Sequence, residues 1–134
     1  MSEGWPGAAA APSLDDIAHL AELAFAALPD LFRASAGDIV FRVDDFPDAE
    51  MLSELGLQDP FELTGLYQGT DLSRQTVLEA AEPARVFLFR RPLLDEWAER
   101  GDVTLAELIA HVLIHEIGHH LGLSDEQIDR IESD

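Results

Sequence analysis

The sequence contains no cysteine, no lysine and no asparagine. Without cysteine, the chain has no disulfide framework, thiolate zinc finger, iron–sulfur cluster or cysteine nucleophile. Its 8 arginines face 27 acidic residues, which gives a formal net charge of −19. Such a surface repels nucleic acids and anionic membranes, so we expect neither as a partner. A basic peptide or protein is the easier partner for this charge, although an acidic surface more often serves solubility alone.

Long apolar runs are also missing. No stretch of about 18 apolar residues is present, and the N-terminus lacks the basic segment of a secretion signal, so we expect a cytoplasmic protein without a membrane span. Hydrophobic residues still make up 47% of the 134 residues, enough for the core of one domain. Residues 1–12 are rich in glycine, proline and alanine. They predict a flexible leader before a single domain over 13–134.

Local signals divide this domain into short elements. The predicted helices cover residues 14–27, 48–55, 94–100, 104–121 and 124–132, and the predicted strands cover 39–43, 86–89 and a short piece near 66–67. Three of these helices begin with the spacing of a capping box, at Ser13, Thr104 and Ser124. A few short strands before the longest helix indicate a mixed α+β fold.

The longest predicted helix contains the segment His115-Glu116-Ile117-Gly118-His119, which has the form H-E-x-x-H. Residues four apart lie on one face of a helix, so the two imidazoles can converge on one metal ion. Glu116 lies about 100° around the helix from His115, where it can hold a water molecule without taking a coordination position. This pattern predicts a zinc site in which His115 and His119 are ligands.

The helical projection gives a second argument for a metal. It places Glu116, and also His119, within the sector formed by the apolar residues of the helix. A buried acid costs several kcal/mol unless it is paired or close to a cation. A metal site makes use of such an acid, whereas a purely structural helix rarely contains one.

The motif extends to H-E-x-x-H-x-x-G-x-x-D, from His115 to Asp125. It resembles the metzincin signature with Asp in place of the third His, as in snapalysin-like enzymes. It is more similar to the small bacterial zincins described as minimal matrix-metalloproteinase-like. The segments 41–47, 65–69 and 89–93 also resemble that family, and the resemblance covers about residues 14–128.

This resemblance implies a zincin-like α+β fold, in which a small mixed β-sheet packs on a long active-site helix with flanking helices. It implies an edge strand above that helix that holds an extended peptide. It also implies Zn²⁺ bound by His115, His119 and Asp125, with Glu116 as the catalytic base. The chain also departs from the metzincins in a second respect, because its only methionines, Met1 and Met51, precede the motif and leave no methionine turn.

The third ligand has alternatives. Asp125 lies in the first turn of a predicted helix, where the helix dipole alone favours an acid. Glu126 and Asp129 are less favoured substitutes. We expect His111 to be a surface residue or to support a ligand, and His120 to pack or lie at the surface.

Other residues have two interpretations each. Tyr67 either donates a hydrogen bond to an oxyanion or, as we favour, packs at the edge of the core. Arg90 and Arg91 either bind a substrate carboxylate or, as we favour, neutralise nearby acids. Gly118, inside the helix, predicts the close approach of another backbone.

We therefore expect a zinc-dependent peptidase that acts on a peptide or protein, with Glu116 activating a zinc-bound water. One alternative is a zinc hydrolase of another amide or ester. The other is a metal-binding domain without catalysis, whose acidic surface docks a basic partner.

Overall fold

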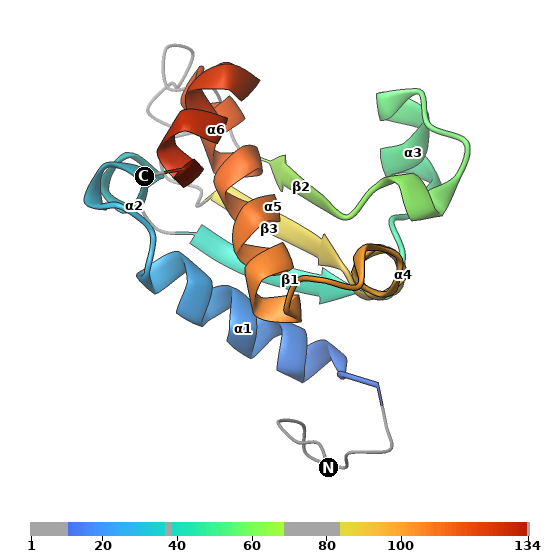
Figure 1. Ribbon diagram of the computed structural model, residues 1–134. Helices are drawn as coiled ribbons and strands as arrows, with labels where there is room; N and C mark the ends of the chain where they lie inside the picture. Colours follow the sequence, from blue (N-terminus) through green and yellow to red (C-terminus); the bar gives the residue numbers. More distant parts are fainter. Residues whose placement is uncertain (1–10, 37–38, 69–83, 134) are drawn as a thin grey trace.

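Residues 11–36, 39–68 and 84–133 are described in a computed structural model (Figure 1). The helices are α1 (Leu14–Ala26), α2 (Asp30–Ala36), α3 (Ala49–Leu55), α4 (Arg90–Arg100), α5 (Leu105–His120) and α6 (Asp125–Ser133), with a 3₁₀ turn η1 at Pro60–Glu62. The strands are β1 (Ile39–Asp44), β2 (Gly65–Gln68) and β3 (Ala84–Phe89). Among these helices, none combines the length and the apolar character needed to cross a membrane.

The three strands form one mixed sheet in the order β1-β3-β2. β1 runs parallel to the central strand β3, with Ile39 opposite Ala84, and β2 runs antiparallel to it, with Gly65 opposite Leu88. β2 is therefore an edge strand within the described part of the chain. In Figure 1 it lies between α5 and α3.

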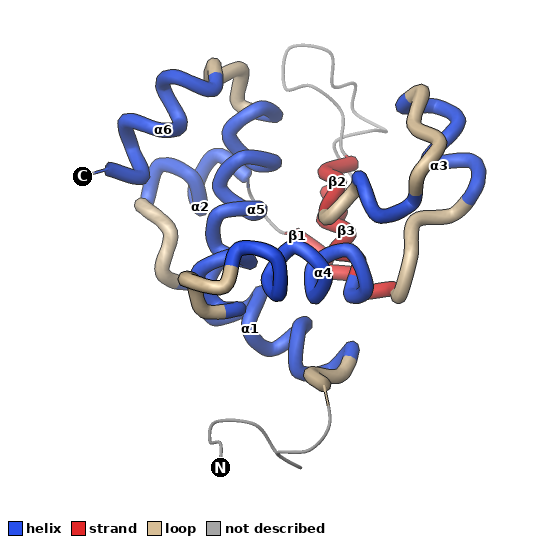
Figure 2. Tube along the Cα trace, turned by 45° about the vertical axis from the view of Figure 1, so that its right-hand side comes forward, coloured by secondary structure: helices blue, strands red, loops and turns tan. Residues whose placement is uncertain are grey.

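The core lies between this sheet and the helices α1 and α5. Its largest cluster joins Ile17 and Ala21 of α1, Val86 and Leu88 of β3, and one face of α5. A second cluster, around Phe32, Ile117 and Ile128, joins the C-terminal half of α5 to α2 and α6 (Figure 2). The burial of these apolar side chains fixes α5 against both the sheet and α6.

The fold is mixed α and β, with a small mixed sheet beside the long helix, as predicted. The capping boxes at Ser13 and Thr104 are present, and α1, α3, α5 and α6 begin and end within about two residues of the predicted bounds. The predicted leader over residues 1–12 lies outside the described residues apart from Ala11 and Pro12. Pro12 is buried, and its carbonyl accepts a hydrogen bond from Arg90 Nε at 2.6 Å.

Two element predictions were wrong. The helix α2 was not predicted, because Pro29 was interpreted as the end of a helix; its carbonyl instead accepts from the amides of Phe32 and Arg33 and begins a new one. The helix α4 begins at Arg90, four residues before the predicted start. Pro92 lies in its first turn, where the missing N–H has no intrahelical partner to lose.

Candidate metal centre

The candidate site lies on the C-terminal half of α5 and on α6, which follows it. α5 begins at Thr104, whose side chain accepts from the Glu107 amide while the Glu107 carboxylate accepts from the Thr104 amide. It ends with Gly122 in a left-handed conformation, and the amides of Gly122 and Leu123 donate to the carbonyls of His119 and Gly118. This Schellman turn folds the chain back, so that α6 packs against the last turns of α5.

Gly118 determines how closely α6 approaches. A Cβ atom at this position would lie 2.7 Å from Cδ1 and 2.8 Å from Cγ1 of Ile128, whose side chain is fully buried. The prediction that another backbone approaches Gly118 was therefore wrong in its partner, because the side chain of Ile128 makes the close contact. Because of this contact, the first turn of α6 lies beside the C-terminal end of α5.

This packing brings together the three residues predicted as metal ligands. His119 Nε2 lies 2.7 Å from Asp125 Oδ1, and one ligand atom each from His115, His119 and Asp125 lie within 4.8 Å of one another. The prediction that His119 belongs to the apolar sector was wrong, because its side chain is 49% exposed. The helical projection assumes that the apolar sector is buried along the whole length of the helix. At its C-terminal end, however, this sector of α5 faces α6 and solvent.

Glu116 is held on the sheet side of the same helix. The backbone N–H of Tyr67, in β2, donates to Glu116 Oε1 at 3.0 Å. Burial of the carboxyl group raises its pKa above the ordinary value. This hydrogen bond and the charges of His119 and His115 lower the pKa in part. Glu116 is therefore a half-buried carboxylate of increased basicity next to the predicted ligands.

The Tyr67 amide reaches Glu116 because β2 lies close to α5. A Cβ atom at Gly65 would lie 2.7 Å from Val112 Cγ1, so only glycine fits without displacement. Backbone groups in an antiparallel pair alternate between the partner strand and the outer edge. Since the Tyr67 N–H points to Glu116, the backbone of Tyr67 faces the outer edge of β2, where no strand of the described residues pairs with it.

The remaining residues singled out from the sequence have structural contacts. The Tyr67 ring stacks on His120 at 4.2 Å between centroids and packs against both core clusters. Burial raises the pKa of the Tyr67 hydroxyl. Arg90 pairs with Asp45 at 3.1 Å, and Arg91 lies over the Phe46 ring. The contacts of Tyr67 and Arg90 agree with the packing and charge-neutralising roles that we favoured, whereas the contact of Arg91 is with an aromatic ring and leaves its favoured role a prediction.

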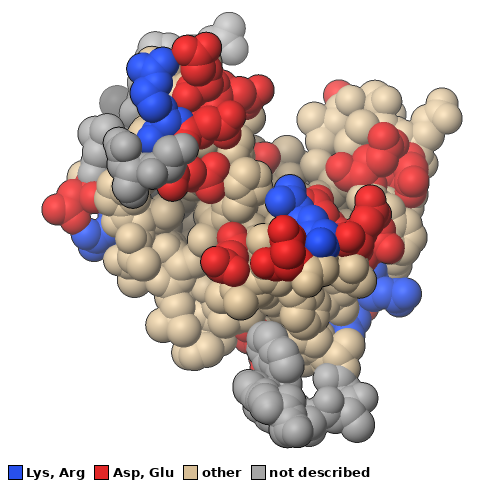
Figure 3. All heavy atoms as spheres, viewed as in Figure 1, with Lys and Arg blue, Asp and Glu red and all other residues tan. Residues whose placement is uncertain are grey.

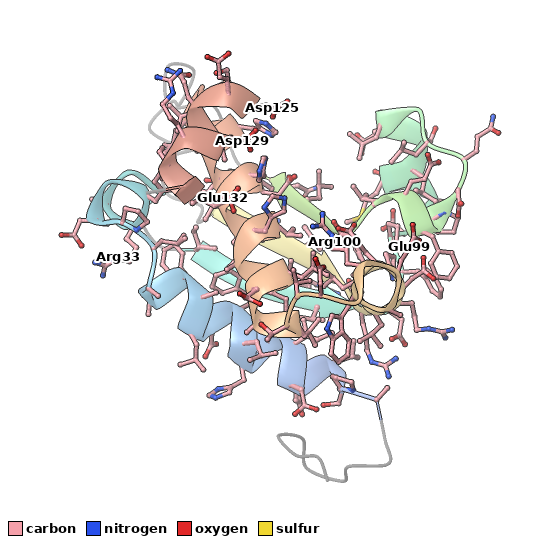
Figure 4. The ribbon with its side chains drawn as sticks, in the orientation of Figure 1. Arg33, Glu99, Arg100, Asp125, Asp129 and Glu132 are labelled. Atoms are coloured by element: carbon pink, nitrogen blue, oxygen red, sulfur yellow. The ribbon has the colours of Figure 1, made fainter. Side chains whose placement is uncertain are left out.

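One residue near the histidines was missed in the sequence. Glu132, at the end of α6, lies 2.9 Å from His111 Nδ1 and 3.1 Å from His115 Nε2. Figure 4 shows Asp125, Asp129 and Glu132 spaced along α6. The recurrence of acids at intervals of three or four from Asp125 was the available signal, but residues 111 and 132 are too far apart in sequence to be paired by inspection.

The comparison with protein families agrees with this geometry. A family model for zincin-like metallopeptidases matches residues 36–134, which include the whole sheet, α5 and α6. The chain belongs to the zincin-like metallopeptidase family. A search of curated proteins found no match to the chain. As a zincin, it belongs among proteins that act on peptides or proteins with the help of a metal, typically zinc.

The residues of this zincin fit such an ion. Zinc binds imidazole nitrogens and carboxylate oxygens at about 2.0–2.2 Å, and tetrahedral ligands at that distance are about 3.3 Å apart. The ligand atoms of His115, His119 and Asp125 already lie within 4.8 Å of one another, on two helices that pack together. Two neutral nitrogens and one carboxylate are also a ligand set that zinc enzymes use.

Proposed function

We propose that this zincin is a zinc-dependent peptidase in which His115, His119 and Asp125 hold the metal and Glu116 is the general base. The observation that carries the proposal is the position of Glu116. Its carboxylate is half-buried, has a raised pKa and belongs to the same helix turn as the two histidines. A structural carboxylate gains nothing from this environment, whereas a general base gains basicity.

The chemistry divides between the metal and the chain. When bound, zinc would act as a Lewis acid that polarises the scissile carbonyl and lowers the pKa of a water molecule. Glu116 accepts a proton from the attacking water as the water oxygen bonds to the carbonyl carbon. The C–N bond then breaks, and Glu116 returns the proton to the leaving amine. The Tyr67 N–H engages Oε1 and so orients the carboxylate for both transfers.

The edge strand β2 offers a place for the substrate. The outward-facing carbonyl of Tyr67 can accept a hydrogen bond from an extended peptide that adds to the sheet beside α5. Figure 3 shows a hollow between the α6 side and the α3 side of this face, with acidic side chains on both sides of it. These acids favour a basic peptide, in keeping with the net charge of −19.

A peptide-library digest tests this function. Wild type loaded with zinc should cleave peptides, with more cleavage of basic than of acidic sequences, and a chelator should stop it. Glu116→Gln should retain the zinc and lose turnover by at least about 100-fold, since the amide cannot take up the proton. Cleavage that persists in Glu116→Gln and in chelator would contradict the proposal.

The same variant separates the alternatives. Wild type that hydrolyses esters or other amides but no peptide, and loses this activity in Glu116→Gln, would be a zinc hydrolase of another class. Wild type that binds zinc and a basic protein, with no hydrolysis and no change in Glu116→Gln, would be a metal-binding interaction domain.

A further inference from the structure

A second group of metal-ligating side chains lies beside the first. It consists of His111, His115 and Glu132, whose ligand atoms also lie within 4.8 Å of one another. The rings of His111 and His115 are 4.4 Å apart, closer than the 6.0 Å between the rings of His115 and His119. The face of α5 that carries the three histidines therefore presents two overlapping ligand sets, one completed at the start of α6 and the other at its end.

The distances in the second group suit a tetrahedral metal. His111 Nδ1 to Glu132 Oε2 is 2.9 Å and His115 Nε2 to Glu132 Oε1 is 3.1 Å. Both are near the separation of about 3.3 Å expected for two ligands of one zinc ion. A carboxylate only accepts hydrogen bonds, so both nitrogens donate to Glu132 in this arrangement. A metal ion at this position would bind each ring in the tautomer that carries its proton on the other nitrogen.

Burial and charge also support an ion at this position. The side chains of His111, His115 and Glu132 are 40%, 21% and 27% exposed, so the group is partly shielded but open to solvent on one side. Asp129 Oδ1 lies 3.7 Å from His115 Nε2 and adds a second carboxylate next to the group. Two imidazoles next to two carboxylates attract a divalent cation more strongly than they attract a monovalent one.

We propose that His111, His115 and Glu132 form a second metal position, which takes zinc when the first position is disabled and which shares His115 with it. On α5, His111 lies five residues before Glu116, more than one helical turn away, whereas His115 is adjacent to Glu116 and His119 lies three residues after it. An ion moved towards His111 is thus displaced from the proposed general base. The second position holds the metal without placing it for hydrolysis.

The test is zinc affinity in a chain whose first position is disabled. His119→Ala, in the full-length protein, removes one ligand of the first position and none of the second. It should still bind one zinc ion, more weakly than wild type, as measured by competition with a chromophoric chelator. Loss of a residue that only supports a ligand costs about 10–100-fold in metal affinity, so loss of a ligand from the second position should cost at least as much.

Matched double variants locate the remaining ion. In the His119→Ala background, Glu132→Gln and His111→Ala should each lower the zinc affinity by at least about tenfold. Asp125→Asn should leave it unchanged, although it also removes a carboxylate from α6. All these side chains are partly or fully exposed, so the variants should fold, which circular dichroism checks.

Two results would overturn the proposal. One is a His119→Ala chain that binds no zinc above the level of His115→Ala. The other is an equal loss of affinity from Asp125→Asn and Glu132→Gln in that background. Neither result depends on peptide cleavage, so the proposed peptidase function can fail without affecting the second position, and the reverse also holds.

Discussion

The carboxyl group of Glu116 is subject to opposing influences from its surroundings. Burial favours its neutral form and raises its pKa, while the Tyr67 N–H and the charges of His119 and His115 favour the carboxylate. Burial has a larger effect than these three groups together, so the pKa of Glu116 is raised overall. The carboxyl group of Glu116 therefore lies in an environment that disfavours its ionised form, as is typical of groups that transfer protons.

This balance predicts a pH-dependent effect on stability. A carboxyl group with a raised pKa in the folded chain binds protons more tightly there than in the unfolded chain, so its contribution to stability falls as pH rises above about 4.3. In chelator, the unfolding free energy of Glu116→Gln minus that of wild type should therefore increase from pH 4 to pH 7. Urea unfolding at the two pH values measures this difference. A difference that stays constant or decreases would contradict the environment described for Glu116.

At the scale of elements, two glycines determine how closely β2 and α6 approach α5. Gly65 allows β2 to lie against Val112, which brings the Tyr67 amide to Glu116. Gly118 allows Ile128 to pack, which brings Asp125 to His119. The proposed base and the proposed third ligand thus depend on different contacts of the same helix.

Alanine at these two glycines should have separable effects. Overpacking costs about 1–3 kcal/mol, and at Gly118 the higher helix propensity of alanine returns up to about 1 kcal/mol. Gly118→Ala should displace α6 and lower zinc affinity. Gly65→Ala should keep zinc affinity and lower the rate of peptide cleavage. Zinc titration and peptide kinetics on both variants give the comparison, and equal zinc affinities would show that the Ile128 contact does not position Asp125.

The caps of α5 and α6 offer a second matched pair. The side chain of Thr104 accepts from the Glu107 amide at 3.0 Å, and that of Ser124 accepts from the Gln127 amide at 3.2 Å. Replacing either residue with alanine should cost about 1 kcal/mol of unfolding free energy. Only Ser124→Ala should also weaken zinc binding, because Asp125 is the next residue. Zinc binding that weakens equally in Thr104→Ala would indicate a general loss of stability instead.

The elements that could be predicted from the sequence are those with local signals. α5 has a capping box, an apolar face and a glycine after its end, so its bounds follow from neighbouring residues. α2 has only seven residues and begins at the carbonyl of Pro29, and the acid Asp30 in its first turn was the available signal for its start. β2, with four residues, was expected only as a short piece because Pro60, Gly65 and Gly69 around it favour a loop.

The candidate site divides in the same way. The spacing of His115, Glu116, His119 and Asp125 lies within eleven residues, so a helix and one turn suffice to predict that they meet. The hydrogen bond from Tyr67 to Glu116 and the approach of Glu132 to His111 join residues 49 and 21 positions apart. These contacts depend on how β2 and α6 pack on α5, which local patterns do not determine.

At the scale of the whole molecule, excess negative charge dominates the surface. Among the described residues, several arginines form ion pairs with nearby acids, and such exposed pairs contribute little to stability. The whole chain has a formal net charge of −19, and Figure 3 shows acidic side chains gathered over several parts of one face. This field should draw basic peptides towards the molecule.

Salt should therefore reduce the rate at which basic peptides are captured. Raising ionic strength from about 0.01 M to about 0.15 M shortens the screening length from about 30 Å to about 8 Å. For a basic peptide, kcat/KM should fall over this range while kcat changes little, and a neutral peptide of the same length is the control. An equal response of the two peptides would show that surface charge does not select the substrate.

The most direct test of the whole account is the zinc content of wild type and of His115→Ala after equilibrium dialysis, measured by elemental analysis. Both proposed metal positions use the His115 ring. The account predicts one zinc ion per wild-type chain and loss of that ion in a folded His115→Ala chain. Wild type without zinc, or His115→Ala that binds zinc as wild type does, would contradict it.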